Sequence, residues 1–378
     1  MTPVRYVNLQ RAAERYEAEL LRVLGTVVRS GTYIGGAELA RFEAEFAAFC
    51  GVRHAVGVAN GLEALELTLR AWGIGPGDEV IVPANTAIPT ALAVTHAGAE
   101  VVLADVEDDT GLIDLASVEA HVMPKTRAVI PVHLYGHPCD MTALRVLAER
   151  HGLLILEDAA HAHGALFEGR RCGALADAGA FSFYPTKNLG AFGDGGCVTT
   201  GDNALAARIR SLRNLGLTTN YQHEVRGFNS RLDPLQAAVL RWKLPHMDAW
   251  NARRRDLAAL YLRELDDVNG VTPPTVRPWA KPVWHAFPVR VHDGFRDDVE
   301  SALREAGIET NVHYRVPIHL QGAYVGRWAR GAFPVSERRA LELLSLPLDA
   351  FHTDDEVKRV VAVLRASLYA ARARRPRG

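Results

Sequence analysis

The sequence has few cysteines and no long apolar run, and each absence argues against a class of protein. Its four cysteines lie far apart with no CxxC pair, so neither a disulfide framework nor a zinc ribbon is expected. No stretch approaches the roughly 18 apolar residues that a membrane-spanning helix requires, and the N-terminus lacks a secretory signal pattern. We therefore expect a soluble, cytoplasmic protein that is not bound to a membrane.

The chain also has no excess of positive or of negative charge. The formal net charge is −1, which gives no electrostatic reason to expect nucleic acid as a partner. Neither a GxGxxG segment after a strand nor a GxxxxGK[ST] segment is present, so dinucleotide and P-loop sites lack their usual pattern. With 378 residues, 48% of them apolar, the chain is long enough for two compact domains with their own cores.

Short apolar runs alternate with helical patterns along most of the chain. This alternation predicts an α/β fold with a mainly parallel sheet covered by helices on both faces. A long helical pattern at 235–265, interrupted at Pro245, then leads to a C-terminal part with a predicted strand and two helices. We expect a large domain over residues 1–240 and a smaller α+β domain over 241–378. The predicted strands are 80–82, 101–104, 128–132, 153–156, 178–183, 197–200 and 287–291, and the predicted helices include 9–24, 37–50, 141–151, 203–212, 296–306 and 354–369.

The segment FSFYPTKNLGAFGDGG, residues 181–196, places one lysine in a setting suited to chemistry. An apolar run delivers Lys187 into a stretch rich in glycine, where the backbone can turn tightly and approach a ligand. Apolar and aromatic neighbours reduce the hydration of a charged amine and make it available as a nucleophile toward a carbonyl, as in Schiff-base formation. A surface lysine in a loop is the alternative, and the neighbouring segments must decide between them.

An acid stands at the end of the preceding apolar run. Residues 153–156 lead into Glu157 and Asp158, and the ends of parallel strands are where α/β proteins bind their ligands. An aspartate there and a lysine further along could hold pyridoxal phosphate, with Asp158 at the ring nitrogen and Lys187 at the aldehyde. The alternative for Asp158 is a structural helix cap.

A helix start also follows a strand-like run near residue 60. Asn60 is a good N-cap, and Glu63 completes the capping-box spacing. The backbone N–H groups at Gly61 and Leu62 are therefore expected at the positive end of a helix, which suits a phosphate group.

A metal site is the competing interpretation of the segment around Asp158. Asp158, His161 and His163 are residue types that bind metals. Because the usual zinc-finger and HExxH spacings are absent, we expect no metal.

Six segments, in order, resemble those of the DegT/DnrJ/EryC1/StrS sugar aminotransferases, a family of pyridoxal-phosphate enzymes of fold type I. The resemblance covers nearly the whole chain and implies an aspartate-aminotransferase-like fold, whose large domain has a sheet of the seven-stranded type. The segments are GVANGLEAL (57–65), GDEVIVPANT (77–86), EDAAHAHGA (157–165), FSFYPTKNLG with GDGG (181–196), GFNSRLDPLQAA (227–238) and VHYRVPIHL (312–320).

The resemblance implies roles for individual residues. Lys187 and Asp158 are the implied catalytic residues. Asn229 and Arg231 match a segment that reaches the neighbouring subunit, which implies a homodimer with shared active sites. The implied cofactor contacts are Gly61, Leu62, Thr86, Asp158, His161, Ser182, Lys187 and Asn229, and the implied substrate contacts are Tyr184, Arg231, His313, Tyr314 and His319.

Two positions depart from the family pattern. Members commonly carry Ser-Gly-Thr where this chain has Asn60-Gly61-Leu62, so a hydroxyl toward the phosphate is missing. Ala87 stands where an aromatic residue often stacks on the cofactor. These departures concern the packing of the cofactor and leave the lysine and the acid in place.

The function implied is the transfer of an amino group from an amino acid, L-glutamate, to the keto group of a nucleotide-linked deoxysugar. The segment NGLEAL favours amination at C3. One alternative is amination of a cyclitol or amino-shikimate-type ketone. A dehydratase on the same scaffold is a further alternative. Dehydratases of this family carry histidine at the position of Lys187, so the lysine argues against dehydratase activity. A non-catalytic regulatory protein that binds pyridoxal phosphate is the third alternative.

Overall fold

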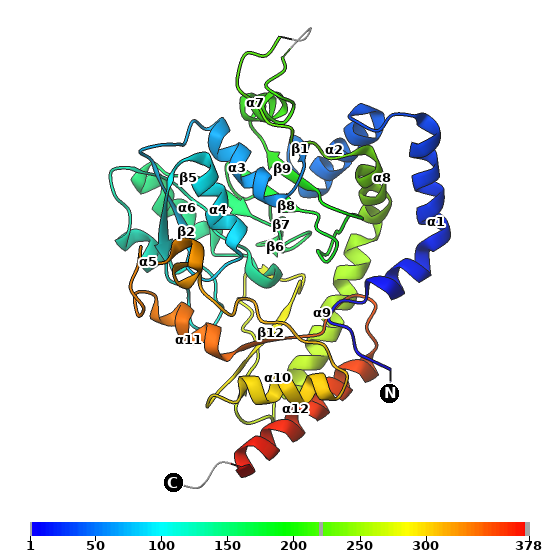
Figure 1. The fold of residues 1–378 in the computed structure, drawn as a ribbon, viewed down its shortest axis with the longest axis vertical. Helices are drawn as coiled ribbons and strands as arrows, with labels where there is room; N and C mark the ends of the chain where they lie inside the picture. Colours follow the sequence, from blue (N-terminus) through cyan, green and yellow to red (C-terminus); the bar gives the residue numbers. More distant parts are fainter. Residues whose placement is uncertain (1, 219–221, 375–378) are drawn as a thin grey trace.

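The computed structural model describes residues 2–218 and 222–374, and it is built around a sheet of seven strands (Figure 1). The strand order is β1-β9-β8-β5-β4-β2-β3. Strand β9 runs antiparallel to both of its neighbours, and the other pairings in the sheet are parallel. The bounds are β1 His54–Val58, β2 Glu79–Pro83, β3 Glu100–Ala104, β4 Thr126–Val129, β5 Leu154–Asp158, β8 Ala178–Ser182 and β9 Gly196–Thr200.

Both faces of this sheet are buried, which explains why its strands are continuous apolar runs. Successive side chains of a strand point to opposite faces. In β2, for example, Ile81 lies in one hydrophobic core while Val80 and Val82 lie in another. The predicted α/β fold with a mainly parallel sheet is confirmed.

Helices cover the two faces in two separate groups. Apolar side chains of α3, α4 and α7 pack in the core on one face, and those of α2, α5, α6 and α8 pack in the core on the other. Helix α1 lies along the outside of α8 (Figure 1). The bounds are α1 Leu9–Ser30, α2 Gly36–Cys50, α3 Gly61–Ala71, α4 Ile88–Ala97, α5 Leu115–Ala120, α6 Met141–His151, α7 Asn203–Arg213 and α8 Pro234–Lys243, with a 3₁₀ turn, η1, at Leu134–Gly136.

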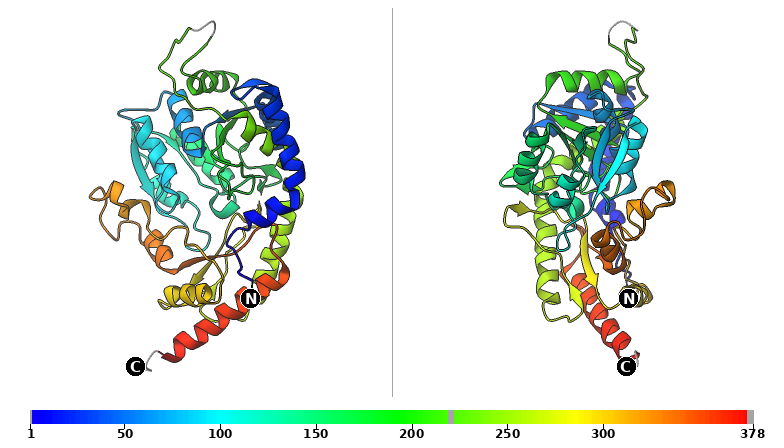
Figure 2. Two further views of the ribbon diagram at one scale, coloured as in Figure 1. Left: turned by 45° about the vertical axis from the view of Figure 1, so that its right-hand side comes forward. Right: turned by 90° about the vertical axis from the view of Figure 1, so that its left-hand side faces the viewer.

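The C-terminal part forms a second, smaller unit at one end of the molecule (yellow to red in Figure 2). It contains a three-stranded antiparallel sheet in the order β10-β12-β13, and a third hydrophobic core that also includes Val4 from the start of the chain. The bounds are η2 Leu244–His246, α9 Met247–Leu265, β10 Val271–Thr272, β12 Phe287–Val291, α10 Arg296–Glu305, η3 Ile318–Leu320, η4 Gly322–Tyr324, α11 Pro334–Glu342, β13 Leu343–Leu346 and α12 Asp354–Arg374.

Two connections join the parts. The predicted interruption at Pro245 is present, since α8 ends at Lys243, a 3₁₀ turn follows, and α9 begins at Met247. Strand β11 (Ala280–Lys281) pairs with β6 (Leu166–Phe167), which also pairs with β7 (Arg170–Arg171).

A division into two domains remains our proposal. The predicted boundary between residues 240 and 241 falls within α8. Along α8 and α9, buried apolar side chains up to Met247 pack in the core of the large sheet, whereas those from Leu257 to Leu265 pack in the third core. Val283 and Ala286, further along the chain, return to the core of the large sheet. Within the described ranges, no helix is both long enough and apolar enough to cross a bilayer.

Candidate active site

Polar side chains meet at the carboxyl ends of neighbouring strands, where a cavity of about 570 Å³ opens. Asp158 is the last residue of β5, and Ser182 is the last residue of β8. This is the edge of a parallel sheet at which α/β proteins bind their ligands. The cavity brings together these predicted residues: Gly61, Leu62, Thr86, Asp158, His161, Ser182, Tyr184 and Lys187.

Lys187 is enclosed by protein but reached from this cavity. Burial lowers the pKa of its amine to about 8, and the nearby charge of Asp158 opposes this shift. The lysine turn, residues 183–191, is closed by hydrogen bonds from the Lys187 N–H to the Tyr184 carbonyl (2.8 Å) and from the Ala191 N–H to the Phe183 carbonyl (2.8 Å). A lysine with a lowered pKa is neutral more often near neutral pH, which makes it a better nucleophile and base.

Asp158 is 6% exposed and held by two hydrogen bonds. The Thr90 hydroxyl donates to its Oδ2 (2.8 Å), and the Ala160 N–H donates to its Oδ1 (3.2 Å). Burial raises the pKa of the carboxyl, while these hydrogen bonds and the charge of Lys187 oppose that shift. Sequence analysis missed Thr90, although its spacing of four residues from Thr86 places both at one helix start, where their hydroxyl oxygens lie 3.2 Å apart.

His161 is buried, with a protonation state that its neighbours define. The Tyr135 N–H donates to His161 Nδ1 (3.3 Å), so the neutral ring carries its hydrogen on Nε2. Burial and the charge of Lys187 hold the pKa of His161 well below its ordinary value. The ring can therefore donate one hydrogen bond from Nε2.

The start of α3 closes the cavity opposite the lysine. The Asn60 side chain accepts the Glu63 N–H (2.9 Å) and donates to Glu63 Oε1 (3.2 Å), so the predicted N-cap is present. A Cβ added at Gly61 would lie 2.6 Å from the Ser182 Cβ, which brings the helix start against the end of β8. The Gly61 and Leu62 N–H groups at this helix start suit a phosphate.

The remaining predicted residues do not line this cavity. Arg231 donates to the Asn214 side chain (3.1 Å), and Asn214 forms a backbone bridge with Asn229. The side chain of His319 is 1% exposed, and its Nε2 lies 2.9 Å from Glu337 Oε1. A single subunit therefore does not bring these three predicted residues to the lysine.

His313 and Tyr314 lie behind the cavity. The His313 carbonyl accepts the Tyr135 hydroxyl (2.6 Å), and its ring lies 2.9 Å from Ser345 Oγ. Burial and the charge of Lys187 lower the pKa of His313 to about 4, and burial raises the pKa of Tyr314. Both side chains are thus neutral near neutral pH.

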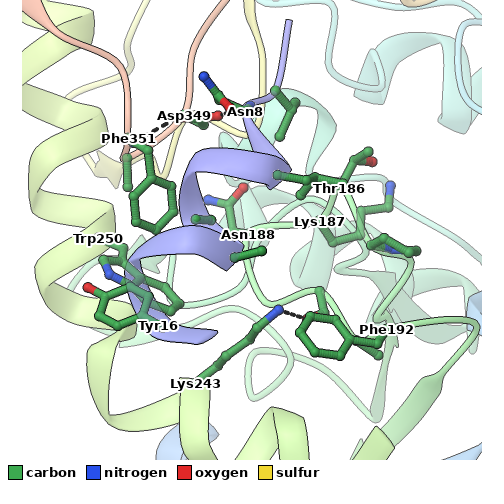
Figure 3. A pocket seen from close by; sticks show the side chains of 18 of the residues that line it. Asn8, Tyr16, Thr186, Lys187, Asn188, Phe192, Lys243, Trp250, Asp349 and Phe351 are labelled. Atoms are coloured by element: carbon green, nitrogen blue, oxygen red, sulfur yellow. Dashed lines mark hydrogen bonds between the residues drawn. The ribbon is translucent and has the colours of Figure 1, made fainter. Parts of the chain in front are cut away.

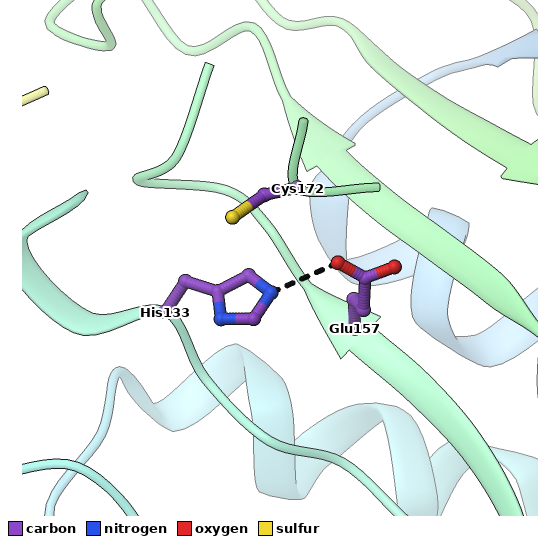
Figure 4. A group of neighbouring side chains, drawn as sticks. All are labelled: His133, Glu157 and Cys172. Carbon is purple, nitrogen blue, oxygen red and sulfur yellow. Dashed lines mark hydrogen bonds and ion pairs between the residues drawn. The ribbon is translucent and has the colours of Figure 1, made fainter. Parts of the chain in front are cut away.

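Among the described residues, one cluster has the composition of a metal site, and it does not include Asp158 (Figure 4). His133 Nε2 lies 2.9 Å from Glu157 Oε2, with Cys172 beside them. The carboxylate also accepts three backbone N–H groups, and His133 Nδ1 accepts the Cys139 N–H (3.1 Å). Because these donors and acceptors are already paired, the cluster is a structural network.

A model of the DegT/DnrJ/EryC1/StrS aminotransferase family matches residues 14–365. The chain belongs to this family. The dTDP-3-amino-3,4,6-trideoxy-alpha-D-glucose transaminase of Streptomyces venezuelae is 51% identical over 363 residues, covering 96% of this chain and 95% of that protein.

Solved structures agree with this assignment. The crystal structure of S. venezuelae DesV in complex with a ketimine intermediate has a TM-score of 0.95 and 49% identity, covering 100% of both chains. NtdA of Bacillus subtilis, whose structure contains the cofactor pyridoxamine phosphate, has a TM-score of 0.89 and 28% identity, covering 97% of this chain and 86% of that one. The predicted enzyme class, a pyridoxal-phosphate-dependent aminotransferase, is confirmed.

The residues of this DegT/DnrJ/EryC1/StrS member fit the cofactor. A buried carboxylate, a lysine of lowered pKa and an open helix start all face one cavity. Both departures from the family pattern, Leu62 and Ala87, line the same cavity. At these positions an apolar side chain replaces a hydroxyl and an aromatic ring.

Replacing Gly61 with alanine should weaken cofactor binding about tenfold, because the new methyl group must displace Ser182 or the helix start. Titration of the apoprotein with pyridoxal phosphate measures this. Gly201→Ala is the matched control, since no atom lies within 4 Å of an added Cβ there. Equal affinities for the two variants would contradict a phosphate site at the helix start.

A second cavity, of about 350 Å³, also borders the lysine turn and shares Lys187 with the first cavity (Figure 3). Its walls include the aromatic side chains of Tyr16, Trp242, Trp250 and Phe351. Here α8 holds the turn in place: Lys243 Nζ donates to the Gly190 carbonyl (2.6 Å) and lies 4.7 Å from the centre of the Phe192 ring. The lysine turn is therefore also held by a side chain of α8.

Proposed function

We propose that this enzyme transfers the amino group of L-glutamate to the keto group of a nucleotide-linked deoxysugar, at C3. The observation that carries the proposal is the pairing of Lys187 with Asp158 in one cavity, in a chain 51% identical to a dTDP-3-amino-sugar transaminase. The similarity covers 96% of the chain, which supports a substrate of the same class.

Different residues of the cavity would contact different parts of the cofactor. The N–H groups of Gly61 and Leu62, with the Ser182 hydroxyl, would hold the phosphate. Asp158 would face the ring nitrogen, His161 Nε2–H would donate to the ring oxygen, and Thr86 would contact the ring. When bound, pyridoxal phosphate supplies an electron sink for the substrate carbon.

Lys187 and Asp158 carry the chemistry of the protein. Lys187 would hold the cofactor through its aldehyde, and the free Nζ would move a proton to or from the substrate carbon. A pKa of about 8 suits this exchange, because an amine near its pKa both accepts and releases a proton at neutral pH. The negative charge of Asp158 favours a protonated ring nitrogen.

We also propose a homodimer with shared active sites. Asn229 and Arg231 lie between α7 and α8, and in one chain they do not line the cavity. In a dimer, Asn229 would reach the cofactor of the neighbouring subunit, and Arg231 would reach its substrate.

A cytoplasmic location is supported by four cysteines that are all buried and unpaired.

For the substrate, we propose contacts from residues at the mouth and back of the cavity. Tyr184 lines the cavity and is 53% exposed, and His313 lies close enough to Lys187 for the lysine's charge to lower its pKa, with Tyr314 next to it in the chain. His319 was predicted with them, but its hydrogen bond to Glu337 and its contact with Phe333 favour a structural role.

The donor and the acceptor can be tested separately in the loaded enzyme. L-Glutamate alone should convert the visible absorption band of the bound cofactor to that of the pyridoxamine form within one half-reaction. A dTDP-linked 3-keto-6-deoxyhexose should then restore the band. Stopped-flow absorbance measures both steps.

The acceptor panel should also contain a 4-keto isomer and an inosose-type cyclitol ketone. Restoration by the cyclitol alone would replace our proposal with the cyclitol alternative. A faster reaction with the 4-keto isomer would leave the substrate class intact and overturn the assignment to C3. A cofactor band unchanged by any amino donor would overturn the proposed transamination.

A further inference from the structure

His285 comes from the C-terminal part of the chain, between α9 and β12, but lies against the cofactor site. It precedes β12, and its N–H donates to the Tyr135 carbonyl (2.8 Å). Its ring stacks on that of His161, with ring centres 4.1 Å apart and an angle of 29° between the planes. His161 lines the active-site cavity, whereas His285 is the layer beneath it.

Asn188 connects this stack to the lysine turn, since it directly follows Lys187 (Figure 3). The Asn188 Nδ2 donates to the Val283 carbonyl (2.9 Å) and to Asn251 Oδ1 (3.1 Å), which fixes the orientation of its amide. Its Oδ1 must then accept, so His285 Nδ1, 3.3 Å away, carries the hydrogen.

The two stacked rings therefore hold their hydrogens on different nitrogens, Nε2 in His161 and Nδ1 in His285. Burial keeps both neutral, and it holds the pKa of each well below the ordinary value. The charged and titratable groups that act on the pair are Lys187, His163, His313 and Arg254, with Asp158 beside the lysine.

The ring of His161 needs a second contact to fix its orientation. Among the described residues, its ring has one hydrogen-bond partner, the Tyr135 N–H, and at 3.3 Å that bond is long. A single contact at Nδ1 leaves the ring free to tilt about that point. A flat ring packed on its face removes the tilt and fixes the direction of the Nε2–H group.

We propose that His285 is a positioning residue that holds His161 in the orientation in which Nε2–H donates to the ring oxygen of pyridoxal phosphate. This inference rests on the cofactor contact of His161 under the proposed function. A hydrogen-bond donor at the ring oxygen of the cofactor withdraws negative charge from that oxygen. This weakens proton binding at the nearby nitrogen through which Lys187 would be joined to the cofactor. Loss of the orientation should raise the pH at which that nitrogen loses its proton.

Two variants of the full-length, cofactor-loaded enzyme separate the stack from the hydrogen bond. His285→Gln lacks the ring but keeps a donor for Asn188, and His285→Phe keeps the ring but lacks the donor. The readout is the pH midpoint of the visible cofactor band, together with the dissociation constant of the cofactor. We expect the midpoint to rise by about half a unit in the Gln variant and by less than about 0.2 unit in the Phe variant.

Two further variants provide references. His161→Leu should raise the midpoint at least as much as His285→Gln. His163→Leu is the matched control, because His163 is fully buried near the same lysine but its ring lies against Phe181 and Phe183. Its midpoint should stay at the wild-type value.

The outcomes distinguish this inference from the proposed function. If the wild-type protein failed to bind pyridoxal phosphate, the proposed function itself would fail. If His161→Leu moved the midpoint and His285→Gln did not, the role of His285 would be overturned. A half-unit rise in His285→Phe alone would overturn it as well, so either variant tests the inference should the other fail to fold.

Discussion

Lys187→Ala should reduce turnover by about 10⁵-fold, the largest effect expected from any single substitution in this chain. The variant loses both the nucleophile for the cofactor's aldehyde and the base that moves the proton at the substrate carbon. Steady-state amino transfer gives the loss in kcat. The absorption spectrum should show free rather than lysine-linked cofactor, because the phosphate contacts and Asp158 remain.

Lys243→Met is the matched control for this substitution. Lys243 also has a pKa of about 8 and contacts the same turn, but it faces the second cavity. The Lys243→Met variant loses one hydrogen bond to the Gly190 carbonyl, so the activity of this variant should fall by less than about tenfold. Comparable losses of turnover in the two variants would mean that the turn needs both lysines for its shape and that Lys187 has no chemical role.

Asp158→Asn should lower kcat by about 10³-fold. The amide keeps the shape of the carboxylate and an oxygen for the Thr90 hydroxyl, but it lacks the charge that keeps the ring nitrogen protonated. Single-turnover reaction with L-glutamate isolates this effect from acceptor binding. Thermal unfolding should change little, because burial opposes ionisation of this carboxyl in the folded protein.

Thr90→Val provides the comparison for Asp158. It removes one donor to the carboxylate and keeps the charge, so a loss of about threefold to tenfold is expected. Should Asp158→Asn react with L-glutamate at the rate of Thr90→Val, the charge at the ring nitrogen would not matter for the reaction.

Local signals were enough to predict part of the site. Asp158 is the last residue of an apolar strand, Lys187 follows another within a few residues, and parallel strands bring such positions to one edge. The N-cap at Asn60 was predictable for the same reason, since capping depends on residues three positions apart.

Contacts between distant segments were not predictable in this way. His285 lies 124 positions after His161, counting from 161 to 285, and no periodicity links them. Strand β13 was missed because LLSL directly follows α11 without a glycine or proline between them. The reversed direction of β9 was also not predicted, since a buried apolar run looks the same in either direction.

The contacts of Val4 bring the first residues of the chain into the third hydrophobic core. Val4 forms a backbone bridge with Ile308, donates its N–H to the Gly307 carbonyl (2.9 Å) and accepts the Glu309 N–H (2.9 Å). This core thus combines Val4 with residues 257–371, and the large sheet lies between them in the sequence. During synthesis the strands of the large sheet would leave the ribosome before the partners of Val4 are made, so this core can close only after them. An excised C-terminal fragment would lack that piece.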